Sequence, residues 1–170
     1  MTTAGSPLTW SALPPSLRTL GWWLTIVQVV GYTTSLVFVW HTTRLTPGGV
    51  AGHYRGTNPE VTEVAMQFPK SFSEMLTLTH THLLSMAVIF VLSGLGLALC
   101  SRPGERWKRI LIGEPFVALL VSFCAMWLMR YVDPRFSWLL VASSTLLALT
   151  FYLQAFLILR ELARLPRQQS

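Results

Sequence analysis

The chain has 170 residues, of which 52% are hydrophobic and only 12% are charged. A soluble domain usually carries about a quarter charged residues, so this composition excludes an ordinary soluble domain and indicates a membrane protein. The net charge of +6 does not indicate nucleic-acid binding, because no run of Lys and Arg with interleaved aromatic residues lies outside the apolar segments.

We expect one all-α domain over residues 1–170, with an N-terminal polar tail that is not a cleaved signal and four membrane-spanning helices. A spanning helix needs about 20 apolar residues. The first, second and fourth apolar runs reach that length. The third run reaches it if it begins near Ile110 and tolerates Glu114. The predicted spans, in chain order, are residues 19–40, 78–100, 110–132 and 136–159.

The links between the predicted spans differ greatly in length. The first, over residues 42–77, is long, whereas residues 101–109 and 133–135 form short links. Short links force neighbouring helices to be antiparallel, so the sequence predicts an up-down four-helix bundle with one long extracytoplasmic loop. In that loop, residues 46–49 are typical of a turn. Ser71 and Glu74 match a capping box, which predicts that the second helix begins about seven residues before its apolar part.

Orientation follows from the basic residues. Lys and Arg gather on the side of the termini, with only two acidic residues to oppose them, whereas the side of the long loop is almost balanced. The positive-inside rule therefore places both termini in the cytoplasm and the long loop outside. The residues on the basic side are Arg18, Arg102, Arg106, Lys108, Arg109, Arg160, Arg164 and Arg167.

All four histidines lie in one stretch that begins at the outer end of the first span and runs into the second: His41, His53, His80 and His82. With the predicted threading they gather near one face of the bilayer. Imidazole is the commonest protein ligand for metals. His80 and His82 lie about 200° apart around a helix, so both cannot readily face one ion. His41 with His82, or with His80, has the geometry by which antiparallel helices hold a haem or a metal.

Three interpretations of this cluster stay open. The histidines hydrogen-bond headgroups, water or backbone; or they ligate haem b; or they bind copper or zinc. The candidate metal ligands are His41, His53, His80, His82 and Met86, and thioethers such as Met66, Met75 and Met86 would favour copper(I). The acids that could orient an imidazole are Glu63, Glu74 and Asp133.

Some polar residues lie inside the predicted spans. Glu114, followed by Pro115, could relay protons, but we favour a side chain that snorkels to the interface or caps the helix. Gln28, Gln154 and Tyr152 are expected to make interhelical hydrogen bonds.

Two strings in the second quarter of the chain resemble a known group of proteins. They are Gly52-His53-Tyr54-Arg55-Gly56 and Thr79-His80-Thr81-His82-Leu83-Leu84-Ser85-Met86, joined by Phe68-Pro69-Lys70-Ser71 and Glu74. The region, about residues 41–90, resembles small four-span bacterial membrane proteins that accompany respiratory or multihaem cytochrome components. The resemblance implies an electron-transfer neighbourhood and supplies no reaction.

We therefore expect an accessory or electron-transferring subunit of a redox complex in the bacterial inner membrane, with haem b or another metal near the periplasmic face. One alternative is a cofactor-free structural or assembly subunit whose outer loop clamps a periplasmic partner such as a cytochrome c. A third is a periplasmic copper- or zinc-handling protein. Four spans in 170 residues leave little room for a substrate pocket, which favours a subunit over a free-standing enzyme. The expected partners are other membrane subunits and lipids, and not nucleic acid.

Overall fold

A computed structural model describes residues 8–57 and 67–165, and all regular structure in these residues is helical. A 3-10 turn, η1, precedes five α-helices, four of which are long and apolar enough to cross a membrane. The four predicted spans are therefore confirmed, although each helix extends beyond the predicted range at one or both ends. The elements are η1 (Trp10–Ala12), α1 (Pro15–Thr43), α2 (Pro47–Arg55), α3 (Phe72–Ala98), α4 (Glu105–Tyr131) and α5 (Phe136–Arg164).

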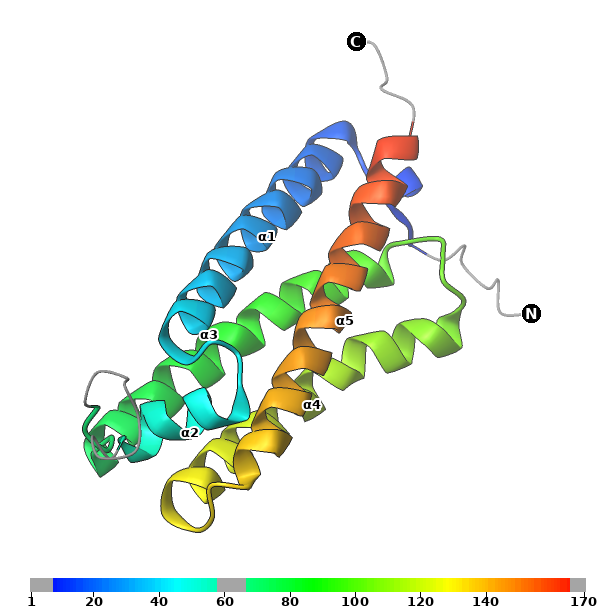
Figure 1. Cartoon of the computed structure of the whole chain (residues 1–170). Coiled ribbons are helices and arrows are strands. Elements are labelled where there is room, and N and C mark those ends of the chain that lie inside the picture. The colour runs from blue at the N-terminus through cyan, green and yellow to red at the C-terminus, as the bar shows by residue number, and fades with distance from the viewer. Residues whose placement is uncertain (1–7, 58–66, 166–170) are drawn as a thin grey trace.

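The four long helices alternate in direction (Figure 1). The start of α1, the α3–α4 link and the end of α5 lie together at one end of the bundle, which we call the terminal end. At the other end lie α2 and the α4–α5 turn. We call this the connector end and residues 44–71 the connector. The alternation agrees with the up-down order predicted from the short links.

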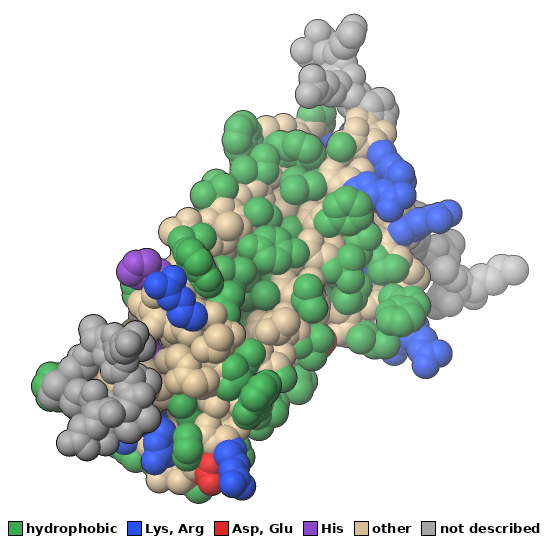
Figure 2. Space-filling view, viewed as in Figure 1, with side chains coloured by type: hydrophobic (Ala, Val, Ile, Leu, Met, Phe, Trp, Pro, Cys, Tyr) green, Lys and Arg blue, Asp and Glu red, His purple; other side chains and the backbone are tan. Residues whose placement is uncertain are grey.

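The surface matches a chain that crosses a membrane. On the face shown in Figure 2, hydrophobic side chains cover the middle of the molecule and Lys and Arg side chains gather toward its two ends. Large apolar side chains are widely exposed on the long helices, Val27, Phe38, Leu84 and Leu149 among them. A soluble monomer rarely leaves so much apolar surface open, whereas hydrocarbon solvates it without cost.

The helices meet around a cluster of aromatic rings. Tyr32 of α1 stacks on Phe151 of α5 with 4.4 Å between ring centroids, and Phe90 of α3 meets the same ring edge to face at 6.4 Å. Ala118 and Leu119 supply the buried contribution of α4. All four long helices thus contribute to one core.

The residues before α1 fold under the terminal end. Trp10 is buried and donates from Nε1 to the carbonyl of Gly96 at 2.9 Å, and its ring fills the space beside Gly21. Arg18 donates to the carbonyls of Trp10 and Leu13. These contacts order the described part of the N-terminal segment.

The predicted long loop between the first two spans differs from the structure. Residues 46–49, expected to form a turn, begin the nine-residue helix α2. The hydroxyl of Thr46 accepts from the N–H of Gly49 at 3.0 Å, and Pro47 occupies the first helical position, where its missing N–H costs nothing. Because α1 runs to Thr43 and α3 begins at Phe72, the connecting segment is shorter than the predicted 42–77 and partly helical.

Candidate functional site

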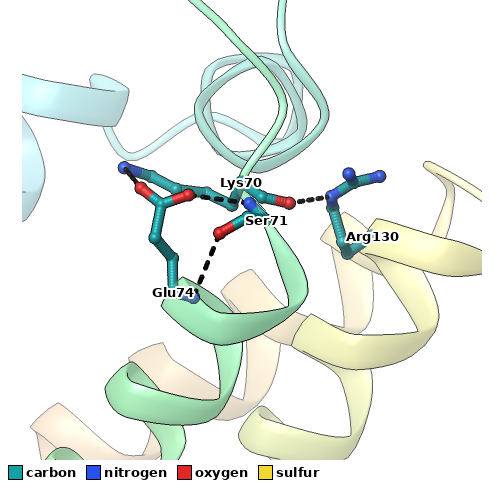
Figure 3. A network of polar contacts seen from close by, with 4 residues as sticks. All are labelled: Lys70, Ser71, Glu74 and Arg130. Atoms are coloured by element: carbon teal, nitrogen blue, oxygen red, sulfur yellow. Dashed lines mark hydrogen bonds and ion pairs between the residues drawn. The ribbon is translucent and has the colours of Figure 1, made fainter.

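Two arginines fasten the connector to the end of α4. Arg55, the last residue of α2, donates from Nη1 to the carbonyl of Met129 at 2.8 Å. In the opposite direction, Arg130 donates from Nε to the carbonyl of Lys70 at 2.8 Å (Figure 3). Hydrogen bonds from an ionised donor are about twice as strong as neutral ones. These two bonds therefore fix the end of α2 and the start of α3 relative to α4.

Two segments of the connector, residues 54–57 and 67–70, are also bonded to each other. The N–H of Lys70 donates to the carbonyl of Tyr54 at 2.9 Å, and the N–H of Thr57 donates to that of Gln67 at 3.0 Å. Gly56, between these pairs, has a φ of 86° and lies so close to Gln67 and Pro69 that a Cβ would not fit. The described part of the connector leaves the bundle and returns to it at one place.

The start of α3, where the connector ends, has the capping box that the sequence predicted. Glu74 accepts from the N–H of Ser71 at 2.7 Å, and the Ser71 hydroxyl accepts from the N–H of Glu74 at 3.3 Å (Figure 3). This is the expected capping box. Lys70 lies 3.5 Å from the Glu74 carboxylate, an exposed pair that adds little stability.

An open pocket of about 500 Å³ lies where the connector meets the end of α1. It brings together two of the four histidines. Burial lowers the pKa of His53 below its ordinary value of 6.5, and the positive charge of Lys70 lowers it further. A neutral imidazole has one free acceptor nitrogen for a ligand or a partner. The pocket is lined by His41, Thr42, His53, Gln67, Phe68, Pro69, Lys70 and Glu74.

The other predicted ligands do not line this pocket. His80 and His82 are exposed on α3, and Nδ1 of His82 lies 3.1 Å from the carbonyl of Leu78 in the preceding turn. Met86 packs against the aromatic core. Within residues 8–57 and 67–165, no three His, Cys, Asp or Glu side chains lie close enough to share a metal ion. The haem and metal sites stay predictions. Glu63, Met66 and Arg167 lie outside the described residues.

A second polar region, which sequence reasoning treated as incidental, lies inside the bundle. Pro115 has no N–H to donate to the carbonyl of Leu111 four residues earlier. Gln154 of α5 donates its side-chain N–H to that carbonyl instead, at 2.6 Å. The interhelical hydrogen bond expected for Gln154 is thus confirmed.

The preferred prediction for Glu114 is wrong. Both of its carboxyl oxygens are buried and have no hydrogen-bond partner in the described structure, so this side chain neither snorkels to the interface nor caps a helix. The Oε1 atom of Gln154 is likewise buried and unpartnered. Leu111 and Glu114 are one turn apart and share a face of α4. We call Leu111, Glu114, Pro115 and Gln154 the α4–α5 seam.

Comparison with known families agrees with the fold. The model of a family described as a transmembrane helical domain matches residues 44–169, from the connector through α5. No curated protein and no solved structure matches the chain. The match covers more than half of the chain and includes both polar regions, apart from the end of α1.

Proposed function

We propose that this chain, which belongs to the family of transmembrane helical domains that matches it, is an accessory subunit of a larger redox complex in the bacterial inner membrane. Both termini lie in the cytoplasm and the connector lies in the periplasm, where it contacts a partner subunit. The basic residues of the terminal end support this orientation. The redox context rests on the resemblance of residues 41–90.

The observation that carries the proposal is the pinned connector. Its one described helix, α2, has nine residues and is too short to cross a membrane. Two charge-assisted hydrogen bonds and the backbone bonds between residues 54–57 and 67–70 hold the described part of the connector in place. A surface that is already ordered loses little conformational freedom when a partner binds, and this raises its affinity. A fixed surface beside the membrane is what a docking subunit requires.

The chemistry of this surface suits a protein partner. Phe68 is 74% exposed beside the pocket that holds His41, His53 and Lys70. An aromatic side chain next to polar groups is typical of the residues that dominate binding energy at protein interfaces. A periplasmic cytochrome c is the partner class that the resemblance favours.

Helix α1 supports a second contact, inside the membrane. Gly31, Thr34 and Ser35 share one face of the helix and are exposed, and the hydroxyls of Thr34 and Ser35 donate to carbonyls of their own helix. Small residues let a neighbouring helix approach closely. We propose that this face packs against a helix of another subunit.

Co-purification from the native membrane in mild detergent tests the proposal. Wild-type protein should carry partner subunits with it, and Phe68→Ala should release the periplasmic partner. Leu84→Ala, which shortens an exposed apolar side chain on α3 away from the connector, is the matched control and should retain it. A wild-type protein that runs as a monomer without partners would exclude this function.

A second candidate is an electron-transferring or metal-handling subunit, favoured by the shared pocket of His41 and His53. These residues fit a small metal ion such as copper or zinc better than a haem b between His41 and His82, because only His41 and His53 line one pocket. A haem would supply the redox chemistry when bound. Purified protein should then show a metal stoichiometry lost in His41→Ala and His53→Ala but kept in His80→Ala. A reducible Soret band lost in His82→Ala would instead favour the haem.

A further inference from the structure

We propose that Glu114 is a proton-binding site inside the helix bundle, where neither of its carboxyl oxygens has a hydrogen-bond donor in the described structure. The proposal is independent of the accessory role, because it concerns the opposite half of the bundle from the connector.

The depth of Glu114 is the first support. It lies five residues beyond Arg109, the last basic residue at the start of α4, which places its Cα about 7 Å deeper along the axis at 1.5 Å per residue. Its carboxyl oxygens are nevertheless shielded from the surroundings of the bundle. The side chain therefore turns into the helix bundle and not toward the headgroups.

The second support is the imbalance of donors and acceptors. Pro115 removes one donor from the backbone, and the side-chain N–H of Gln154 replaces it at the Leu111 carbonyl. Three buried acceptors then remain without a donor: Oε1 and Oε2 of Glu114 and Oε1 of Gln154. An unpaired carboxylate is very costly in a low dielectric. One proton on Glu114 removes the charge and supplies the missing O–H donor.

Among the described residues, no Lys or Arg side chain is bonded to the Glu114 carboxyl group. The apolar stretches 19–40, 83–99, 110–129 and 136–159 contain no Lys or Arg. A bound metal cation such as Ca²⁺ needs six or more oxygen ligands, and the seam offers three unpartnered oxygens. A proton needs only one.

Polar side chains of α1 and α5 meet in the core of the bundle. The rings of Tyr32 and Tyr152 meet edge to face with 5.9 Å between their centroids. The Tyr152 hydroxyl is bonded to that of Thr33 at 2.8 Å, and Thr33 is exposed on α1. On α3, which packs against the same core, residues 83–98 carry no titratable group.

Reaction with dicyclohexylcarbodiimide in native membranes tests the proposal. The reagent is apolar, and an undissociated carboxyl adds across its C=N bond. The product rearranges to an N-acylurea that keeps every atom of both reactants. Peptide mapping by mass spectrometry should find this adduct on Glu114, and the adduct should be lost in E114Q. A water-soluble carbodiimide with an amine nucleophile should label exposed Glu105 and leave Glu114 unmodified.

Three results would overturn the proposal. Glu114 stays unlabelled while Glu105 reacts; or the water-soluble reagent labels both equally; or Na⁺ at constant pH protects Glu114, which would make it a cation site. The labelling of wild-type protein decides the question even if E114Q folds poorly. Failure of labelling leaves partner co-purification unchanged, so the two proposals fail separately.

Discussion

The connector and the α4–α5 seam satisfy their polar groups in opposite ways. In the described part of the connector and at its contact with α4, the arginines and capping groups are bonded to backbone atoms. In the seam, a proline displaces one donor and three acceptors stay unpartnered. Bonded polar groups specify a shape, whereas each unsatisfied buried polar group calls for a physical explanation. The proposed docking surface and the proposed proton site therefore lie in regions of opposite polar character.

The largest effect is expected where the connector meets α1. A Cβ at Gly49 would overlap the backbone carbonyl of Thr43, which cannot move without displacing the helix end, whereas a Cβ at Gly48 would meet nothing. Gly49→Ala should therefore cost about 3 kcal/mol, at the upper end of overpacking. Gly48→Ala should stabilise by about 0.5 kcal/mol, because alanine limits the unfolded chain. Thermal unfolding in detergent measures both. Equal melting temperatures would show that the connector is not tightly seated.

Removing the Arg55 contact tests whether the connector depends on it. Arg55→Met keeps most of the aliphatic stem but leaves the Met129 carbonyl without this donor, so we expect a loss of about 2 kcal/mol, typical of a hydrogen bond to a charged group. Limited proteolysis of the connector should accelerate accordingly. Arg44→Met is the control, because Arg44 is exposed and packs over the ring of Trp40. Similar proteolysis of both variants would contradict the pinned connector.

In the α4–α5 seam, we expect the effects of two substitutions on the free energy of unfolding to be coupled. Gln154→Leu should destabilise the wild type by about 0.6 kcal/mol, and at most about 1.7, the range for hydrogen bonds between membrane helices. With Pro115→Ala, the new N–H can donate to the Leu111 carbonyl, so the effect of Gln154→Leu should shrink. A double-mutant cycle of unfolding free energies measures this coupling. Strictly additive effects would mean that Gln154 does not replace the donor lost at Pro115.

The smallest effect concerns His53. Because its pKa is lowered in the folded protein, the unfolded chain binds a proton more readily, and stability falls as pH drops below the ordinary value of 6.5. The loss levels off below the folded pKa. His53→Gln should flatten this part of the stability profile, and exposed His80→Gln should not. A profile that is unchanged in His53→Gln would exclude His53 as its origin.

The sequence predicted the spans and the capping box because both depend on local signals: uninterrupted apolar runs, and the Ser71–Glu74 spacing. The predicted turn at residues 46–49 was wrong. The prediction relied on the two glycines and overlooked Thr46-Pro47, which is typical of the start of a helix. Gly49 is required by the close carbonyl of Thr43, a contact that no local pattern contains. The sequence placed Arg55 in the long loop without its distant partner Met129. Pro115 with a lone Gln in the next span was a usable signal for the seam.

The account depends most directly on the membrane topology of the chain. Cysteine substitutions at two glycines test that topology. Gly48 in α2 and Gly104 before α4 lie at opposite ends of the bundle, and a Cβ at either meets nothing. Single cysteines, Gly48→Cys and Gly104→Cys, in a background lacking Cys100 and Cys124, can be labelled in intact spheroplasts with an impermeant maleimide. The account predicts that position 48 reacts at once and position 104 only after permeabilisation. Equal reaction at both positions before permeabilisation, or the reverse order, would contradict it.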